Sequence, residues 1–403
     1  MLQIKPILSM LLRSKSSPLL LLLQIILSVA IVANASFIIH ERLALMDRDS
    51  GVVEQEVFDF TMYSFDPSVD LVQQQHKDLQ LIRDLPGVKS ATFSSMTPLS
   101  GGGWSSSFTI GTSEEDERSA PNSAMYYGDE QMVDTLGVKL IEGRNLRPEE
   151  ILPTFTDSGV KGIVSKAFAD QAFPDESAVG KVIYNGNLGE EAIEIIGVVE
   201  RLQGAWVNSD NLEYSVIIGV ELTNAFMRYL VRAEEGTFTR LKEQIPEVLH
   251  KDQKNRVIQN FTTLTEHRTS VYRDHELMAS VLSLMVVLLL LITSLGLTGM
   301  VMFNIERRTK QIGTRRALGA TKRDVVSLFL VENYIICLVG GVVGGLLAIA
   351  LGQQLMQHYD LPQLEWQYPL ATIVGLVIVT TLAVIFPATK AAKISPAIAT
   401  RSV

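Results

Sequence analysis

Four long apolar segments, separated by polar stretches, dominate the pattern of hydrophobic positions in this 403-residue chain. A helix of about 20 apolar residues, at 1.5 Å per residue, crosses the roughly 30 Å hydrocarbon core of a bilayer. The pattern therefore predicts an α-helical transmembrane domain of four spans. The predicted spans are residues 18–39, 277–303, 325–352 and 370–386.

The polar stretch of residues 40–276, between the first two spans, predicts a large mixed α/β domain with two subdomains. Hydrophobic and polar residues alternate over Glu56–Phe65, as in a half-buried strand. We expect residues about 120–205 to form an inserted subdomain. Strands over Tyr214–Val220 and Met227–Ala233 are expected to rejoin the sheet that begins near residue 56.

Helical periodicity continues beyond the first span, over His40–Asp49, and precedes the second span, over Leu264–Glu276. Two helices emerging side by side would form stalks that carry the domain between them. The alternative is that both segments are helix ends packed beneath the domain.

Charged residues are segregated along the chain. Residues 40–275 carry 38 Asp/Glu and 22 Lys/Arg, whereas the remainder carries 6 acidic and 13 basic residues. Loops rich in Lys and Arg stay on the cytoplasmic side of a membrane. We therefore place residues 1–17, 304–324 and 387–403 in the cytoplasm, and the large domain and the short loop 353–369 outside it.

A cleavable signal peptide is a competing interpretation of the first apolar segment, because Ala33-Asn34-Ala35 follows a basic start and resembles a cleavage site. Against it, the apolar run continues to Ile39. Cleavage would also leave an odd number of spans.

Residues 304–324, hereafter the basic island, contain seven Lys/Arg and two acidic residues. Gly313 and Gly319 bracket a predicted short helix over Thr314–Leu318, and Thr321-Lys322-Arg323-Asp324 has the form of a capping box that starts the next helix. We expect a turn, a short helix along the membrane surface, and a new helix. Charge alone would fit a simple topological anchor.

The amino-acid sequence of the basic island also indicates a function. Residues Glu306–Thr321, ERRTKQIGTRRALGAT, resemble the signature of the MacB/FtsX family of ABC transporter permeases. Three further stretches, Leu136–Arg144, Val164–Ala169 and Ile195–Val199, resemble the periplasmic core domain of the same permeases. Pro387–Pro396 resembles the family's C-terminal ending.

The resemblance implies the permease subunit of an ABC transporter in a bacterial inner membrane. A separate ATPase subunit would bind ATP and Mg²⁺ and would also bind the basic island. This chain would then bind no cofactor itself. A second permease copy or a paralogue would complete the complex. The residues expected to couple to the ATPase are Glu306, Arg307, Arg308, Ile312, Gly313, Arg315, Arg316, Ala317, Leu318, Gly319 and Ala320.

In such a permease the stalks would carry movement to the outer domain and drive export or extrusion of a peptide, an antibiotic, a lipoprotein or a similar molecule by mechanotransmission. A periplasmic adaptor or a substrate protein would be a further partner. The alternative is an FtsX-like regulatory scaffold that activates a partner such as a cell-wall hydrolase. A membrane-anchored enzyme is the third possibility.

Motifs for catalysis are missing from the sequence. It has no Gly-x-x-x-x-Gly-Lys-Ser/Thr loop, no Gly-x-Ser-x-Gly elbow and no paired histidines at metal-ligand spacing, and Cys337 is its only cysteine. We therefore expect no catalytic residue and no metal site in this chain.

Several residues inside the spans invite a structural interpretation. Gly340, Gly341, Gly344 and Gly345 form two overlapping small-xxx-small patterns, which predict close helix packing. We expect Gln24 and Asn34 to hydrogen-bond between helices. Glu332 is expected to pair with an arginine of the basic island.

Overall fold

A computed structural model describes residues 17–110, 118–153, 159–185, 191–221, 224–359 and 363–393. These residues divide into two compact units. The helical unit contains the chain up to Met46 and from His275 onward, and the α/β unit contains Asp47–Asp274. The fold class is the predicted one, with four apolar helices and a mixed α/β domain.

Among its described residues, the helical unit has four long helices and one short helix. The long ones are long and apolar enough to cross a membrane. They are α2 (Ser17–Met46), α7 (Leu264–Arg307, which begins in the α/β unit), α9 (Lys322–Tyr359) and α10 (Gln367–Ala391), and the short one is α8 (Thr309–Ala317).

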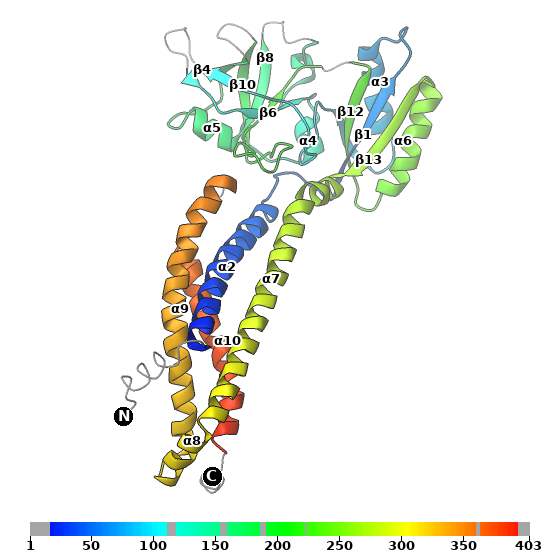
Figure 1. Cartoon of the computed structure of the whole chain (residues 1–403). Helices are drawn as coiled ribbons and strands as arrows, with labels where there is room; N and C mark the ends of the chain where they lie inside the picture. The colour runs from blue at the N-terminus through cyan, green and yellow to red at the C-terminus, as the bar shows by residue number, and fades with distance from the viewer. Residues whose placement is uncertain are drawn as a thin grey trace. The chain divides into compact units, whose positions relative to one another are not determined.

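Helix α9 packs against both α2 and α10 (Figure 1). The contact buries Ile25 and Val29 of α2 with Ile336 and Cys337 of α9 and Leu376 of α10. Helix α7 is more exposed than α2. Only 11% of its most apolar segment is buried inside the chain, compared with 50% for α2. Lipid or another helix must therefore cover most of the apolar surface of α7.

Two of the helices extend well beyond the predicted spans. Helix α2 continues to Met46, and α7 is one unbroken helix of 44 residues. Within the helical unit the two are joined where Arg42 Nη1 lies 3.2 Å from His275 Nδ1. The stretches predicted as stalk helices are thus helical continuations of the spans.

The α/β unit contains a four-stranded antiparallel sheet in the order β13-β1-β12-β2. Its strands are β1 (Val57–Ser64), β2 (Val88–Phe93), β12 (Phe226–Ala233) and β13 (Arg256–Thr263). Helices α3 (Leu71–Arg83) and α6 (Phe238–Asp252) cover one face (Figure 1). Alternate residues of the central strands, Phe58, Phe60, Tyr229 and Val231 among them, form a core beneath these helices.

The second sheet of the α/β unit is mixed and has nine strands within the part of the chain that the structure describes. They are β3 (Ser105–Ser106), β4 (Phe108–Ile110), β5 (Arg118–Ser119), β6 (Ser123–Tyr127), β7 (Leu140–Gly143), β8 (Val160–Ser165), β9 (Val182–Asn185), β10 (Ala192–Val199) and β11 (Ser215–Ile218). The short helices α4 (Met132–Leu136) and α5 (Lys166–Ala172) and the 3-10 turn η2 (Pro148–Glu150) complete it.

The inserted subdomain is wider than the predicted 120–205, since its strands run from Ser105 to Ile218. Strand β12 pairs with β1 and β2, as expected of the strand that rejoins the first sheet. The expectation for Tyr214–Val220 was wrong, because β11 pairs with β6 and β8 of the second sheet. The three residues Val216, Ile217 and Ile218 are fully buried, as a strand with a core on both faces requires.

Candidate functional site

Helix α8 lies within the basic island and begins earlier than the sequence predicts. It spans Thr309–Ala317, so Gly313 lies inside the helix and does not bound it. A glycine inside a helix costs about 1 kcal/mol relative to alanine. The neighbouring Ile312 packs into a core with Val325, Phe329 and Val384, and this tertiary packing outweighs the local preference.

The end of α8 and the start of α9 follow the predicted chemistry. Gly319 has φ +98°, and the amides of Gly319 and Ala320 bond to the carbonyls of Arg316 and Arg315, 3.2 and 3.0 Å away. This is a Schellman ending. The Thr321 amide lies 2.8 Å from Asp324 Oδ2, and the Asp324 amide 3.3 Å from Thr321 Oγ1, which confirms the capping box.

One face of α8 is fixed to the helical unit. Arg308, at its start, donates from Nη1 and Nη2 to the two carboxylate oxygens of Glu332 at 3.0 and 3.4 Å. Arg316 donates to the carbonyl oxygen of Ala392, just after α10, at 2.9 Å. With Ile312 between them, these side chains attach α8 to both α9 and α10, and the predicted pairing of Glu332 is confirmed.

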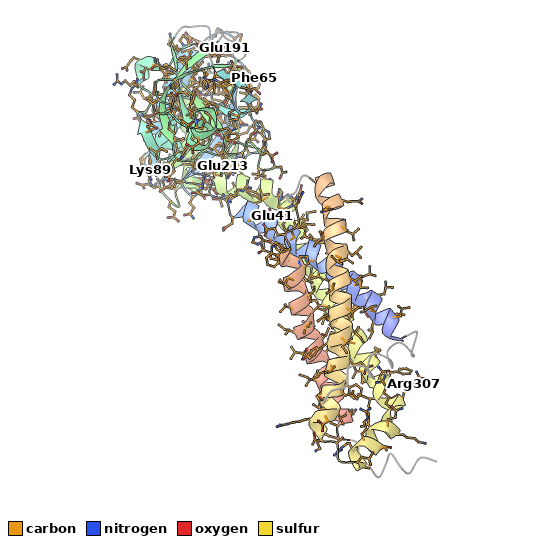
Figure 2. The ribbon with its side chains drawn as sticks, turned by 90° about the vertical axis from the view of Figure 1, so that its left-hand side faces the viewer. Glu41, Phe65, Lys89, Glu191, Glu213 and Arg307 are labelled. Atoms are coloured by element: carbon orange, nitrogen blue, oxygen red, sulfur yellow. The ribbon has the colours of Figure 1, made fainter. Side chains whose placement is uncertain are left out.

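The opposite face of α8 is exposed. Leu318 is 83% exposed, although an apolar side chain gains by being covered. Figure 2 shows Arg307 at the end of the helical unit that carries α8, with its guanidinium 5.4 Å from the Phe303 ring. The predicted coupling residues on the exposed side are Glu306, Arg307, Arg315, Ala317, Leu318 and Gly319.

The predicted ATPase-coupling residues therefore fall into two groups, one exposed and one packed against the rest of the helical unit. Arg308, Ile312, Gly313 and Arg316 are buried or half-buried against the helical unit, as is Ala320 in part. The sequence prediction omitted Lys310, Gln311 and Thr314, which are exposed beside Arg307 and Arg315. Helical spacing of four residues, counted back from Arg315 to Gln311 and from Leu318 through Thr314 to Lys310, is the signal that would have included them.

This arrangement can receive a force, because one face is anchored and the other is free. Among the residues the structure describes, no group of three or more His, Cys, Asp or Glu side chains could hold a metal ion. The exposed side of α8 is the part of the basic island that is accessible to another molecule.

The four glycines of α9 divide between two neighbours. A Cβ atom at Gly344 would lie 2.7 Å from the Ile26 carbonyl oxygen, and one at Gly340 would lie 2.7 Å from Ile25 Cγ2, both on α2. Gly341 and Gly345 face Ile373 on α10. Each small-xxx-small pattern thus holds a different helix of the same chain close to α9.

We expect Gly344→Ala to destabilise the helical unit by about 1–3 kcal/mol, because the added methyl group would overlap the backbone of α2. The thermal unfolding midpoint of the detergent-solubilised chain measures this. Gly375→Ala on α10 is the matched control, since an added Cβ there meets nothing within 4 Å. Equal midpoints for the two variants would contradict the close approach.

Polar side chains within the spans also connect helices. Asn34 donates to the carbonyls of Ala30 and of Ala348 on α9, at 2.9 and 3.1 Å, which confirms its predicted interhelical bond. Ser28 on α2 and Thr293 on α7 lie 2.9 Å apart, Oγ to Oγ1. Gln24 lies against Gly296 of α7.

Family models match both units of the chain. Residues 19–248 match the model described as MacB-like periplasmic core domain, and residues 283–396 match FtsX-like permease C-terminal. The chain belongs to the MacB/FtsX family of ABC transporter permeases. The first model alone covers more than half of the chain and the second includes the basic island, so the resemblance noted in the island and in the large domain is confirmed.

Individual relatives agree with this assignment. The macrolide export ATP-binding/permease protein MacB of Vibrio parahaemolyticus is 25% identical over 60% of this chain and 38% of its own length. MacB of Neisseria gonorrhoeae is 26% identical over 69% of this chain and 44% of its own. The probable syringafactin export ATP-binding/permease protein SyfD of Pseudomonas syringae is 30% identical over 55% and 35%.

The chain therefore spans well under half the length of these MacB/FtsX relatives. Two solved structures are similar to part of it. The periplasmic region of MacB from Actinobacillus actinomycetemcomitans matches 54% of this chain and 94% of its own length at 16% identity and a TM-score of 0.33. The extracellular domain of the transporter YknZ matches 50% of this chain and all of its own at 15% identity and a TM-score of 0.32.

Proposed function

We propose that this permease couples an ABC ATPase, bound at the exposed face of α8, to conformational change in the α/β unit. The ATPase supplies the ATP and Mg²⁺ sites. The α/β unit lies on the periplasmic side of a bacterial inner membrane, and both ends of the described chain face the cytoplasm. Two permease copies, or one copy and a paralogue, form the complex.

The observation that carries this proposal is the two-sided structure of α8. A helix that only anchored the chain to lipid headgroups would have no need for a partly buried ion pair to α9 and a hydrogen bond to the end of α10. Arg308 and Arg316 provide these attachments, while Arg315 and Leu318 stay exposed. A partner that pushes on the exposed face moves α9 and α10 with α8.

We assign export or extrusion to this permease. Mechanotransmission drives it, and no solute passes between the spans. The relatives MacB and SyfD are named as macrolide and syringafactin exporters, which favours export over a purely regulatory scaffold. The exported molecule of this permease belongs to the same broad class of peptides, antibiotics, lipoproteins or similar amphiphiles.

We expect the double variant Arg315→Glu and Leu318→Asp to lose ATPase binding. It reverses one charge and removes the exposed apolar side chain on the free face of α8. Truncating an anchor residue of a protein interface typically costs about 2 kcal/mol or more of binding free energy. Co-purification of an ATPase with the full-length chain, and the stimulation of its ATP hydrolysis, measure the effect.

Lys242→Glu, which reverses an exposed charge in the α/β unit, is the matched control and should bind the ATPase like the native chain. An unchanged thermal unfolding midpoint in the double variant shows that α8 has not simply unfolded. ATPase recovery and stimulation equal to those of the native chain would reject α8 as the coupling helix.

A further inference from the structure

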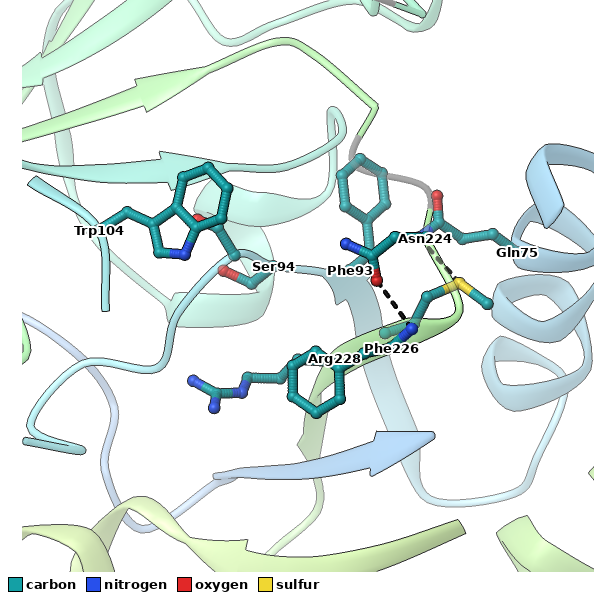
Figure 3. A pocket seen from close by; sticks show the side chains of 9 residues that line it. Gln75, Phe93, Ser94, Trp104, Asn224, Phe226 and Arg228 are labelled. Atoms are coloured by element: carbon teal, nitrogen blue, oxygen red, sulfur yellow. Dashed lines mark hydrogen bonds between the residues drawn. The ribbon is translucent and has the colours of Figure 1, made fainter. Parts of the chain in front are cut away.

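A small cleft opens where the chain passes between the two subdomains of the α/β unit. The chain leaves the first sheet after Phe93 of β2 and re-enters it at Phe226 of β12. Figure 3 shows the cleft between these points, lined by Phe93, Trp104, Asn224, Phe226, Met227 and Arg228. Its cavity volume is about 50 Å³. The proposed coupling at α8 does not involve it.

Exposed aromatic side chains gather at this cleft. Trp104 is 51% exposed and Phe226 is 41% exposed, although both line the same cavity. Phe226 is held by Tyr63, with ring centroids 5.0 Å apart, and Trp104 by Tyr127 at 5.8 Å. Rigid aromatic rings with uncovered faces are typical of sites where an apolar group binds.

Arg228 places a positive charge among these rings. Its Nε atom is buried and has no hydrogen-bond partner among the described residues. Asp59 forms an ion pair with it, but Asp59 Oδ2 lies 3.8 Å from that Nε, beyond hydrogen-bond distance. A buried donor left without an acceptor costs about 1–3 kcal/mol, so the arrangement calls for an explanation.

Asp59 pairs with the charge of Arg228 at 3.8 Å but accepts no hydrogen bond from it, and other residues hold the carboxylate in place. Thr97 donates its hydroxyl to Oδ2 at 2.6 Å, and His267 Nε2 lies 2.8 Å from Oδ1. Among the described residues the guanidinium makes this ion pair and no hydrogen bond, so its N–H groups can donate to a further acceptor. A planar guanidinium matches a carboxylate, which accepts two parallel hydrogen bonds from it.

We propose that this cleft binds an apolar acid, with its carboxylate on Arg228 and its apolar group against Trp104 and Phe226. The cavity has room for only a few water-sized groups, so it accepts the carboxylate and its first carbons. The remainder of the ligand lies on the exposed ring faces. The same chemistry occurs in a free aromatic acid and in the hydrophobic C-terminal residue of a peptide.

Isothermal titration of the full-length chain in detergent tests this site with two probes, N-acetyl-L-phenylalanine and the acetylated peptide Ala-Ala-Phe with a free carboxylate. We expect saturable binding of at least one. The corresponding C-terminal amides should bind at least about tenfold more weakly, since they lose the charge-assisted bonds. Stronger binding of the peptide would identify a chain terminus as the ligand, and stronger binding of the single residue a free acid.

Arg228→Gln should weaken binding of the acids by at least about tenfold and leave the amides unaffected, and Trp104→Ala should weaken both acid and amide. Arg201→Gln, at an arginine of the same unit that does not line the cleft, is the matched control and should bind like the native chain. Arg228→Lys retains the charge and shows whether a loss in Arg228→Gln reflects misfolding. Absence of saturable binding by both acids, equal binding of acid and amide, or native affinity in Arg228→Gln would overturn the proposal.

Discussion

Replacing Arg256 by Met should destabilise the α/β unit by about 3–5 kcal/mol, because it would leave the Asp78 carboxylate buried without its counter-charge. Both side chains are almost completely buried, at 1% and 0% exposure. Urea unfolding of the full-length chain, followed by tryptophan fluorescence, measures the loss. The transition of the α/β unit should move to a clearly lower urea concentration.

Arg256 has this effect because it connects three elements. Its Nη1 lies 2.7 and 2.8 Å from the two oxygens of Asp78 on α3, its Nη2 donates to the Leu249 carbonyl on α6, and its Nε donates to the Gln253 carbonyl at 2.9 Å. Strand β13, which carries Arg256, is an edge strand of the first sheet. The pair therefore attaches this edge to both covering helices.

The double variant Arg256→Met and Asp78→Leu is the informative control. It removes both charges, so no uncompensated ion remains, and apolar replacements of buried pairs are often neutral. We expect it to recover much of the stability that Arg256→Met alone loses. A single variant as stable as the native chain, or a double variant less stable than the single, would show that the pair does not hold the sheet edge.

Much of the fold could be predicted because its signals are local. A long apolar run has few structures open to it in a bilayer, so α2, α7, α9 and α10 follow from composition. The junction of α8 and α9 could be read directly from Gly319 and the Thr321–Asp324 capping box. These residues act on their own backbone within one helical turn.

The errors arose where distant residues decide the structure. Val216–Ile218 is apolar enough for either sheet, and only its burial between β6 and β8 assigns it to the second. Gly313 looks like a helix end in sequence, but the packing of its neighbour Ile312 keeps it within α8. Local patterns contain no information on such contacts.

In the basic island, too, the local sequence predicts some features and tertiary contacts decide the others. Charge and the family signature located the basic island, but they did not separate its anchoring arginines from its exposed ones. Arg307 and Arg308 are adjacent in sequence, yet Arg307 is exposed and Arg308 is paired with Glu332. The distinction depends on which side of α8 meets α9, and hence on tertiary structure.

Replacing Glu332 by Ala should therefore uncouple α8 from α9. The change leaves the half-buried Arg308 without its carboxylate, for which we expect a destabilisation of about 3 kcal/mol, at the low end for a buried pair because Arg308 keeps 17% exposure. Hydrogen exchange of the amides in Thr309–Ala317 should become faster. ATPase binding should persist, since the exposed face of α8 is untouched, while stimulation of ATP hydrolysis falls.

Two variants separate the ion pair from a general loss of packing. Arg308→Met with Glu332→Leu removes both charges and should restore slow exchange in α8, because the helix then rests on apolar contacts with α9. Arg307→Met removes the adjacent exposed charge and should leave exchange unchanged. If Glu332→Ala keeps native exchange and native ATPase stimulation, α8 must be held by Ile312 and Arg316 alone, and α9 would not receive force through Glu332.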